Sequence, residues 1–332
     1  MSDTKKKILI TGGLGFIGCQ LANRLSEEPG TELLLIDNLA RGRMDDEAKA
    51  LIEKENVRFL QGDLTDPTFY EQFGTGYEAV YHFAAVVGVK NVIENPDIVI
   101  RINALATLHL LDWFVAGGGD SLMFPSTSEA YAWTRTFHEL PIPTPEDVPL
   151  AVTNIDNPRT SYAGSKIFGE LAVTHYCAKH NKRFAIVRYH NVYGPRMGTS
   201  HVIPQLYQRA VIDQQNPLTV YSIEHLRAFC YIDDAVEATI ATMRKDGANG
   251  QTFNIGNDEE ETKIGDLAAK IMAVGGVEAP IESKAAENDP INRRCPDLSK
   301  ARELLDYQPK VTLEEGLRRT CAWYKEFYNE QG

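Results

Sequence analysis

The chain has 332 residues, of which 43% are hydrophobic and 24% are charged, and its formal net charge is −12 at pH 7. This length and composition are typical of a folded globular protein with one large domain or two unequal ones. The negative charge disfavours binding to nucleic acid or to an anionic membrane, because both are polyanions, but it allows a small phosphate ligand held by a local group of arginines.

The sequence also bears on location and metal binding. Residues 1–7 are rich in lysine but lack the hydrophobic segment of a signal peptide, and no stretch of about eighteen apolar residues is expected to cross a bilayer. The five cysteines form no CxxC pair, and the eight histidines have no metal-ligand spacing. We therefore expect a cytoplasmic protein with reduced thiols, no membrane partner and no metal.

The first predicted strand, residues 8–11, runs into a turn with three spaced glycines, Gly12, Gly15 and Gly18. Gly12 permits a tight exit from the strand, Gly15 lets the backbone approach a pyrophosphate, and Gly18 lets the next helix lie close to the sheet. The helix expected over 16–25 points its first N–H groups and the positive end of its dipole at the phosphates. The segment predicts a dinucleotide-binding turn, although glycine spacing alone also fits a sharp connection.

A second apolar run, residues 33–36, ends in Asp37. Asp37 lies about twenty residues beyond the glycine turn, where a carboxylate accepts hydrogen bonds from the ribose hydroxyls of an adenosine. This arrangement favours NAD over NADP. Arg41 and Arg43 follow closely and keep a ribose phosphate open as the alternative.

Apolar runs alternate with helical segments through the rest of the first half. Strands are expected at 57–61, 79–83, 121–125 and 184–189, and a further helix at 99–115. This alternation predicts an α/β fold with a doubly wound parallel sheet of the Rossmann type. The ligand crevice of such a sheet lies at the strand ends, which here carry Asp37, Asp63, Ala84 with Ala85, and Ser126 with Thr127. The segment 62–67 is interpreted either as a helix cap or as an adenine contact.

A proline-rich and acidic segment, residues 139–159, predicts a long irregular loop beside the strand that ends at Thr127. After Gly194 and Pro195 the alternation fades into a smaller mixed α/β region. We therefore expect an NAD-binding domain at 1–195 with about 227–247, and a substrate domain at 196–226 and 248–332. The ligand is expected between the two.

Tyr162 and Lys166 open a predicted helix, and their spacing of four residues places them on one face. Free tyrosine has a pKa near 10, so it becomes a base near neutral pH only beside a cation, which Lys166 and an oxidised nicotinamide could supply. The hydroxyl of Thr127 could bind the same substrate oxygen. The three residues predict a hydride-transfer site, although a tyrosine and a lysine at this spacing also occur as a surface pair.

Ten segments carry a family resemblance that runs nearly from end to end: residues 11–18, 36–38, 62–64, 82–85, Asn103 with Thr107, 126–129, Tyr162 with Lys166, 191–196, 227–234 and 289–297. With them the chain resembles the extended short-chain dehydrogenase/reductases, in the NAD-dependent epimerase/dehydratase group that acts on nucleotide sugars. The resemblance implies a tightly held NAD that is reduced and reoxidised within one cycle. The sugar would be oxidised at C4, altered as the ketone, and usually reduced again.

The resemblance also implies roles for individual residues. The residues it assigns to NAD are Gly12, Gly15, Phe16, Ile17, Asp37, Asn38, Asp63, Leu64, Ala84, Ala85, Asn103, Tyr162, Lys166 and Tyr189. The residues it assigns to the nucleotide-diphosphate sugar are Ser128, Asn191, Arg196, Val202, Arg227 and Arg294. The family places Arg227 and Arg294 on the diphosphate, where bidentate geometry suits a guanidinium group.

The choice of reaction depends on Glu129. Sugar 4-epimerases of the family usually have a small residue here, whereas a glutamate indicates further chemistry. The Thr127-Ser128-Glu129 run and the 289–297 tail are similar to UDP-glucuronate decarboxylases, and Arg294 aligns with their substrate-site arginine. We therefore rank decarboxylation first, with Thr127, Glu129, Tyr162 and Lys166 as catalytic residues. Ala130 and Ala132, where related chains have valine and glycine, depart from this pattern.

Other readings remain open. Within the family they are a 4-epimerase and a 4,6-dehydratase, and outside it they are a catalytically silent NAD-binding sensor and a simple NADPH-dependent reductase. Glu129 could also be only a helix-start carboxylate, and Asn191 only a turn former. The resemblance further implies a homodimer that packs through helices near 105–115 and 168–178.

Overall fold

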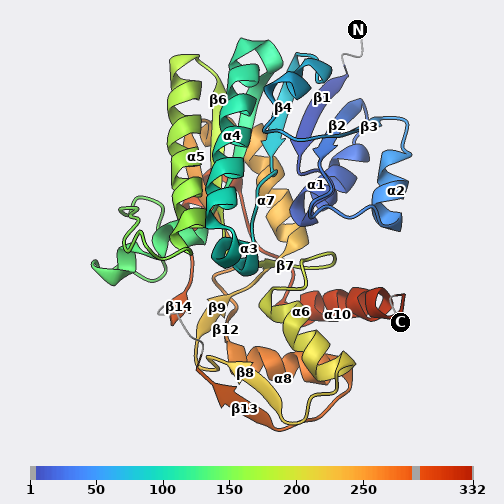
Figure 1. Ribbon diagram of the computed structural model, residues 1–332, viewed down its shortest axis with the longest axis vertical. Coiled ribbons are helices and arrows are strands. Elements are labelled where there is room, and N and C mark those ends of the chain that lie inside the picture. The colour runs from blue at the N-terminus through green and yellow to red at the C-terminus, as the bar shows by residue number, and fades with distance from the viewer. Residues whose placement is uncertain (1–4, 286–291, 331–332) are drawn as a thin grey trace. The chain divides into compact units, whose positions relative to one another are not determined.

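The computed structural model describes residues 5–285 and 292–330, and the chain divides into two compact units (Figure 1). Unit 1 comprises Met1–Phe137, Pro149–Arg188 and Val236–Phe253. Unit 2 comprises His138–Val148, Tyr189–Ala235 and Asn254–Gly332. This division differs from the expected one at residues 138–148, 189–195, 227–235 and 248–253.

The centre of unit 1 is a seven-stranded sheet, and it confirms the doubly wound α/β fold predicted from the sequence. In spatial order its strands are β11 (Gln251–Ile255), β6 (Arg183–Tyr189), β5 (Gly119–Thr127), β4 (Tyr77–His82), β1 (Lys6–Thr11), β2 (Thr31–Asp37) and β3 (Val57–Gln61). The pairs β4–β5, β1–β4, β1–β2 and β2–β3 are parallel. Residues 33–36 of β2 are all buried, as expected of a parallel strand covered on both faces.

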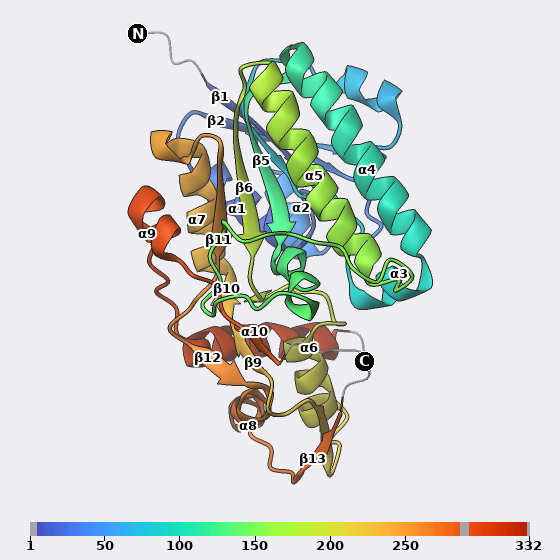
Figure 2. The ribbon, with the colours of Figure 1, turned by 90° about the vertical axis from the view of Figure 1, so that its left-hand side faces the viewer.

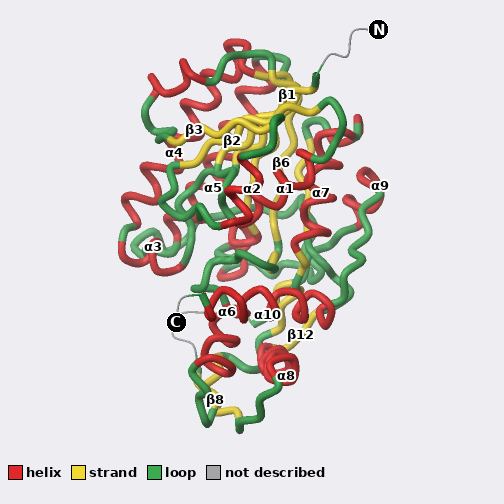
Figure 3. The backbone as a smooth tube through the Cα atoms, turned by 90° about the vertical axis from the view of Figure 1, so that its right-hand side faces the viewer, coloured by secondary structure: helices red, strands yellow, loops and turns green. Residues whose placement is uncertain are grey.

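Helices cover both faces of this sheet (Figures 2 and 3). They are α1 (Phe16–Ser26), α2 (Asp46–Ile52), α3 (Val89–Glu94), α4 (Pro96–Trp113), α5 (Thr160–Lys179) and α7 (Ile232–Arg244), with short 3-10 turns at Pro67–Gln72, Thr134–Thr136 and Asp246–Ala248. In Figure 2, α4 and α5 lie side by side along one face, and α7 lies on the other. An ion pair between Arg24 and Glu237 joins α1 to α7.

The stretch Pro96–Gly118, which is α4 with the π-helical turn Phe114–Gly118, is long and apolar enough by composition to cross a membrane. No such stretch was expected from the sequence. Its inner residues Ala106, Leu110, Leu111 and Phe114 belong to the hydrophobic core of unit 1. Packing against the sheet therefore accounts for the apolar character of this inner face.

Strand β11 was not expected in this sheet. Gly250 N donates to Phe184 O at 2.7 Å, and the five residues that follow pair beside β6. The pairing joins segments that are more than sixty residues apart in the sequence. A pattern of neighbouring residues cannot predict such a pairing. The loop predicted at 139–159 has no helix or strand, and Thr144 in it forms a bridge with Pro296 of unit 2.

Unit 2 contains three small sheets. They are β7 (Val192–Tyr193) with β10 (Cys230–Tyr231), β8 (Leu218–Tyr221) with β13 (Ile281–Lys284), and the order β12 (Glu261–Lys263), β9 (Leu226–Ala228), β14 (Arg293–Arg294). Its helices are α6 (Val202–Tyr207) with the π-turn Gln208–Ile212, α8 (Ile264–Gly275), α9 (Ser299–Leu305) and α10 (Leu313–Asn329). Residues 289–291, the first part of the 289–297 motif, lie outside the described residues.

Candidate active site

The glycine turn after β1 has the geometry of a dinucleotide cradle. Gly12 has φ +66°, and a Cβ there would lie 2.7 Å from Ala84 N, while a Cβ on Gly18 would lie 2.2 Å from Gly12 O. Neither position accepts a side chain. Gly15 begins α1 with no side-chain cap, and its first turn, with Phe16 and Ile17, carries no acidic residue. The positive end of α1 therefore suits the phosphates of a dinucleotide.

Asp37, at the end of β2, fixes the backbone around this turn. Its Oδ2 accepts a hydrogen bond from Leu14 N at 3.1 Å, and its Oδ1 accepts one from Leu39 N at 2.8 Å. The Oδ1 of Asn38 accepts one from Ala40 N at 3.0 Å. This structural role was missed in the sequence. A carboxylate accepts several hydrogen bonds, so Asp37 can bind a ribose hydroxyl while it keeps these backbone contacts.

The segment after β3 fits the cap interpretation of residues 62–67. Asp63 accepts a hydrogen bond from Thr65 N at 2.9 Å, and Asp66 accepts one from Thr68 N at 2.9 Å at the start of a 3-10 helix. The side chain of Leu64 belongs to the hydrophobic core. An adenine contact by Asp63 or Leu64 stays a prediction.

A buried polar chain, missed in the sequence, connects the glycine turn to α5. The hydroxyl of Thr11 contacts Nδ1 of His82 at 2.8 Å, and Nε2 of His82 contacts the hydroxyl of Thr107 at 3.3 Å. Thr107 donates to the carbonyl of Asn103 at 2.8 Å, and Asn103 Nδ2 donates to Ser165 Oγ at 3.1 Å. Burial, with a smaller effect from the charge of Lys166, lowers the pKa of His82 to about 3.

The segment that follows β4 lies against the glycine turn. Ala84 N donates to the hydroxyl of Thr11 at 3.2 Å, so the segment with Ala84 and Ala85 sits beside Gly12. The side-chain amide of Asn103 makes two hydrogen bonds with the backbone of Val86. Its Oδ1 accepts one from Val86 N at 2.7 Å, and its Nδ2 donates one to Val86 O at 3.1 Å. The glycine turn, the segment after β4 and Asn103 of α4 are thus linked at the carboxyl ends of β1 and β4.

Tyr162 and Lys166 both lie in α5, where Lys166 is buried and Tyr162 is partly buried. The ammonium group of Lys166 donates to Pro125 O at 2.8 Å and lies 5.0 Å from the centre of the Phe124 ring. Burial lowers the pKa of Lys166, the charge of Glu170 partly offsets this, and the pKa is left at about 8. Burial and, to a smaller extent, the charge of Glu129 raise the pKa of Tyr162, a hydrogen bond with Thr127 and the charge of Arg41 oppose them, and the pKa is left at about 12.

These contacts modify the expected role of Lys166. The cation that lowers the pKa of Tyr162 in this structure is Arg41, whereas Lys166 is held by Pro125 at the end of β5. The buried phenol therefore stays protonated near neutral pH until further positive charge approaches it. A nicotinamide in its oxidised form carries such a charge.

The end of β5 brings Thr127 and Glu129 to Tyr162. Thr127 caps the 3-10 helix Ser128–Tyr131, and its hydroxyl accepts a hydrogen bond from Glu129 N at 3.2 Å. Glu129 is thus a helix-start carboxylate, as one reading expected, and it also acts electrostatically on Tyr162. Ser128 is buried. A proton acceptor, a hydroxyl and a carboxylate therefore meet within unit 1.

An ion pair behind these residues was missed in the sequence. Arg188, at the end of β6, makes two hydrogen bonds with Glu170, at 2.9 and 2.7 Å, and a third with the Tyr131 hydroxyl at 2.7 Å. Ser126 donates to the same carboxylate of Glu170. Glu170 lies one turn after Lys166 in α5, and Tyr131 ends the 3-10 helix that carries Glu129. The pair therefore ties three elements of the candidate site together.

In unit 2, the small sheet β12–β9–β14 brings two predicted substrate residues together. Arg294 of β14 pairs in register with Arg227 of β9, and Thr262 of β12 is opposite Arg227. These side chains share one face of the sheet because side chains at paired positions point the same way. Arg293 points to the other face and binds Glu261 at 2.8 Å. Two adjacent guanidinium groups suit a diphosphate.

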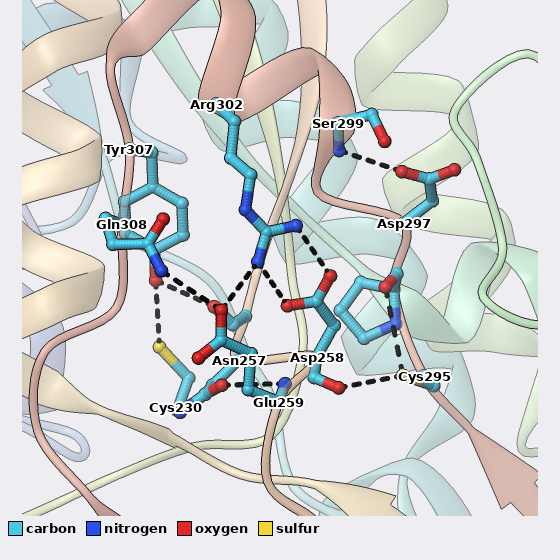
Figure 4. Close-up of polar contacts among 12 residues, drawn as sticks. Cys230, Asn257, Asp258, Glu259, Cys295, Asp297, Ser299, Arg302, Tyr307 and Gln308 are labelled. Atoms are coloured by element: carbon cyan, nitrogen blue, oxygen red, sulfur yellow. Dashed lines mark hydrogen bonds and ion pairs between the residues drawn. The ribbon is translucent and has the colours of Figure 1, made fainter.

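A network of polar contacts connects the chain after β14 to the loop 256–259 (Figure 4). Arg302 of α9 binds Asp258 through two hydrogen bonds, at 2.8 and 2.7 Å. Tyr307 donates to Gly256 O at 2.7 Å, and Gln308 donates to Glu259 at 3.0 Å. The chain after Arg294 is thereby fastened to the loop 256–259 that leads into β12.

The other predicted residues of unit 2 have mainly structural contacts in this structure. Asn191 has φ +41° and donates from Nδ2 to Ala228 O at 3.1 Å, which fits its reading as a turn former. Arg196 is buried with φ +66°, Val202 begins α6, and Tyr189 ends β6. Among residues 5–285 and 292–330, no group of three His, Cys, Asp or Glu side chains could hold a metal.

Comparisons with known proteins place this geometry in context. The model of the NAD dependent epimerase/dehydratase family matches residues 8–256. A UDP-N-acetyl-alpha-D-glucosaminuronate decarboxylase of Bacillus cytotoxicus is 32% identical, over 98% of this chain and all (100%) of its own length. UDP-glucuronic acid decarboxylase 1 of Xenopus tropicalis is 31% identical over 98% of this chain and 74% of its own. The structure of UDP-glucuronic acid 4-epimerase of Bacillus cereus with UDP-glucuronic acid and NAD has a TM-score of 0.85 and 25% identity, covering 97% of this chain and 100% of that one.

Proposed function

Because the chain belongs to the NAD dependent epimerase/dehydratase family, we propose that it decarboxylates a UDP-linked hexuronic acid through a ketone at C4. The chain is an NAD-dependent enzyme that modifies nucleotide sugars, and the family resemblance found in its sequence is confirmed. The observation that carries the finer proposal is the position of Glu129, whose carboxylate acts on the phenol of Tyr162 at the end of β5.

The residues of unit 1 fit NAD. The uncapped start of α1 with Gly15, Phe16 and Ile17 suits the pyrophosphate, and the carboxylate of Asp37 suits the adenosine ribose. We propose that Asn38, Asp63, Leu64, Ala84, Ala85, Asn103 and Tyr189 complete the cofactor contacts. When bound, NAD supplies a hydride acceptor for the C4 carbon of the sugar and returns the hydride later in the cycle.

Tyr162 acts as the base that takes the proton of the C4 hydroxyl. Its pKa of about 12 in the chain alone falls when positive charge is placed nearby. Thr127, which contacts the phenol, orients the same oxygen. Lys166 holds the carbonyl of Pro125 and so fixes α5 against the end of β5.

Decarboxylation follows from the ketone. The C6 carboxylate is then β to the C4 carbonyl, so the C5–C6 bond breaks, carbon dioxide leaves, and the electron pair forms an enolate. Tyr162 and Thr127 stabilise its oxygen by hydrogen bonds. Glu129 repels the substrate carboxylate and favours its departure, after which a water molecule supplies a proton at C5 and the C4 ketone is restored. Arg227 and Arg294 bind the diphosphate, and Ser128, Asn191, Arg196 and Val202 contact the rest of the substrate.

Epimerisation at C4 is the second candidate, because the 4-epimerase of Bacillus cereus shares the fold and is bound to UDP-glucuronic acid. It needs the same oxidation but no loss of carbon dioxide. The difference lies in the groups that face C5 and C6. Glu129 favours the decarboxylase, since rotation and reduction of a ketone need no additional carboxylate.

Product masses test this proposal. We would incubate the protein with UDP-glucuronate, its N-acetylated relative, UDP-glucose and GDP-mannose, with NAD present. We expect loss of carbon dioxide from a uronate, and we expect Tyr162→Phe to abolish it while the circular dichroism spectrum is unchanged. Loss of water would show a dehydratase, an unchanged mass with a new isomer would show an epimerase, and no product with any sugar would support an NAD-binding sensor.

Assembly and location complete the proposal. A homodimer through α4 and α5 is supported by exposed apolar side chains on both helices, among them Ile100 (50% exposed) and Leu171 (55% exposed).

A cytoplasmic location is supported by five buried cysteines that all carry free thiols.

A further inference from the structure

Arg41, which the proposed function does not use, reaches across the end of β1. It follows β2, and its Nη1 donates a hydrogen bond to the carbonyl of Val87, in the segment after β4. Strand β1 lies between β2 and β4 in the sheet, and its end runs into Gly12 and the glycine turn. The side chain of Arg41 therefore spans the edge of the sheet at which a dinucleotide is expected to lie.

Both ends of this span are fixed. On one side, Asp37 and Asn38 hold Leu39 N and Ala40 N, which precede Arg41. On the other side, Asn103 holds both backbone groups of Val86, and Val87 O also accepts a hydrogen bond from Asn91 at 3.1 Å. The residues that fix the span are thus among those assigned to NAD.

The backbone near Val87 leaves room for the guanidinium group. Gly88 has φ +102°, and a Cβ there would lie only 3.3 Å from Arg41 Nη1. The guanidinium group also interacts electrostatically with the phenol of Tyr162. It therefore extends from the adenosine side of the site to the side where the proton is taken.

We propose that Arg41 is a clasp over the bound dinucleotide, with its guanidinium group bridging the Val87 carbonyl and a pyrophosphate oxygen. This inference deepens the proposed function and rests on it, because an enzyme that oxidises and then reduces the same sugar must keep its NAD throughout the cycle. A guanidinium group has five donors and can bind both acceptors, and the charged phosphate is the stronger one. The clasp slows the release of NAD.

The release rate of NAD tests the clasp without any sugar. Protein loaded with radiolabelled NAD is diluted into an excess of unlabelled NAD, and the label that remains bound is followed by rapid filtration. We expect Arg41→Ala to release NAD at least about tenfold faster, in line with the loss of a hydrogen bond to a charged group. Arg41→Lys should fall between the two, because an ammonium group supplies a point charge without the fork.

The control is Arg24→Ala, which removes an exposed arginine of α1 that is paired with Glu237. It should release NAD at the wild-type rate. A second readout is the pH profile of turnover, whose rise should move to higher pH in Arg41→Ala because a cation near Tyr162 is lost. An unchanged release rate in Arg41→Ala would overturn the clasp alone. Slower release would mean that Arg41 competes with NAD, and failure of the wild type to bind NAD would overturn both the clasp and the proposed function.

Discussion

Tyr162 and Lys166 share one helix face but have different partners. Tyr162 contacts Thr127 and responds to Glu129 and Arg41, whereas Lys166 is bonded to Pro125, 41 residues away in sequence. The spacing within α5 could be read from the sequence because a helix repeats every 3.6 residues. The partners could not, because they are set by the packing of α5 on β5 and not by local periodicity. The same holds for Arg188, which binds Glu170 from a different element.

At the residue scale, His82 should govern part of the acid sensitivity of the fold. Burial lowers its pKa to about 3. Below pH 6.5 the imidazole is therefore protonated in the unfolded chain but stays neutral in the folded chain. The free energy of unfolding should therefore fall by up to about 1.4 kcal/mol per pH unit from this group alone. In His82→Gln this contribution is absent, and urea unfolding between pH 6.5 and 4 should show a shallower decline than in the wild type.

Exposed His138, in the loop after the 3-10 turn Thr134–Thr136, provides the control. His138→Gln should keep the wild-type dependence on pH. Equal slopes for His82→Gln and the wild type would contradict the assignment of a neutral, buried imidazole.

At the element scale, the close approach of α5 to β5 depends on Gly169. A Cβ at this position would lie 2.2 Å from Cζ of Phe124. Gly169→Ala should therefore lower the free energy of unfolding by about 1–3 kcal/mol, because the helix or the ring must move. Gly164→Ala, in the same helix, meets only Val152 at 3.8 Å and should be neutral or stabilising. Chemical unfolding of both variants measures the difference in their free energies of unfolding. Equal changes in the two variants would show that the contact between Gly169 and Phe124 does not limit the size of the side chain.

The two faces of the β9–β14 pair allow a second test at this scale. Arg294→Ala should weaken UDP binding about tenfold or more, because it removes a charged donor from the face shared with Arg227. Arg293→Ala removes only a partly exposed ion pair with Glu261 on the other face and should change UDP affinity little. Titration calorimetry with UDP compares them. If both variants bound UDP as the wild type does, the diphosphate would have to lie elsewhere.

Element prediction succeeded where a strand is a continuous apolar run. Residues 57–61 were predicted and observed with the same bounds, and the bounds of the other strands from β1 to β6 differ from the predicted ones by two residues or fewer at each end. It failed for β11, which joins the sheet beside β6 by a pairing with no local signal. The small sheet that carries Arg227 and Arg294 was unexpected for the same reason, since its strands have only two or three residues.

At the scale of the whole molecule, the subunit number should depend on the exposed apolar face of α4 and α5. Leu171→Glu places a charge on this face and should convert a dimer to a monomer in light scattering, because an unpaired charge in an apolar interface is costly. Ile281→Glu, at an exposed apolar position of β13, should leave the mass unchanged. A wild-type protein that is already monomeric, or a dimer that survives Leu171→Glu, would refute this interface.

The interleaving of the two units along the chain also has a consequence for biosynthesis. The sheet of unit 1 takes its last strand, β11, from residues 251–255, after all of unit 2's middle segment (189–235) has been made. A nascent chain leaving the ribosome therefore exposes the open edge of β6 until residue 255 has emerged, and open strand edges attract other chains. Truncation before residue 255 should leave insoluble protein for the same reason, so neither unit can be obtained by shortening the gene from one end.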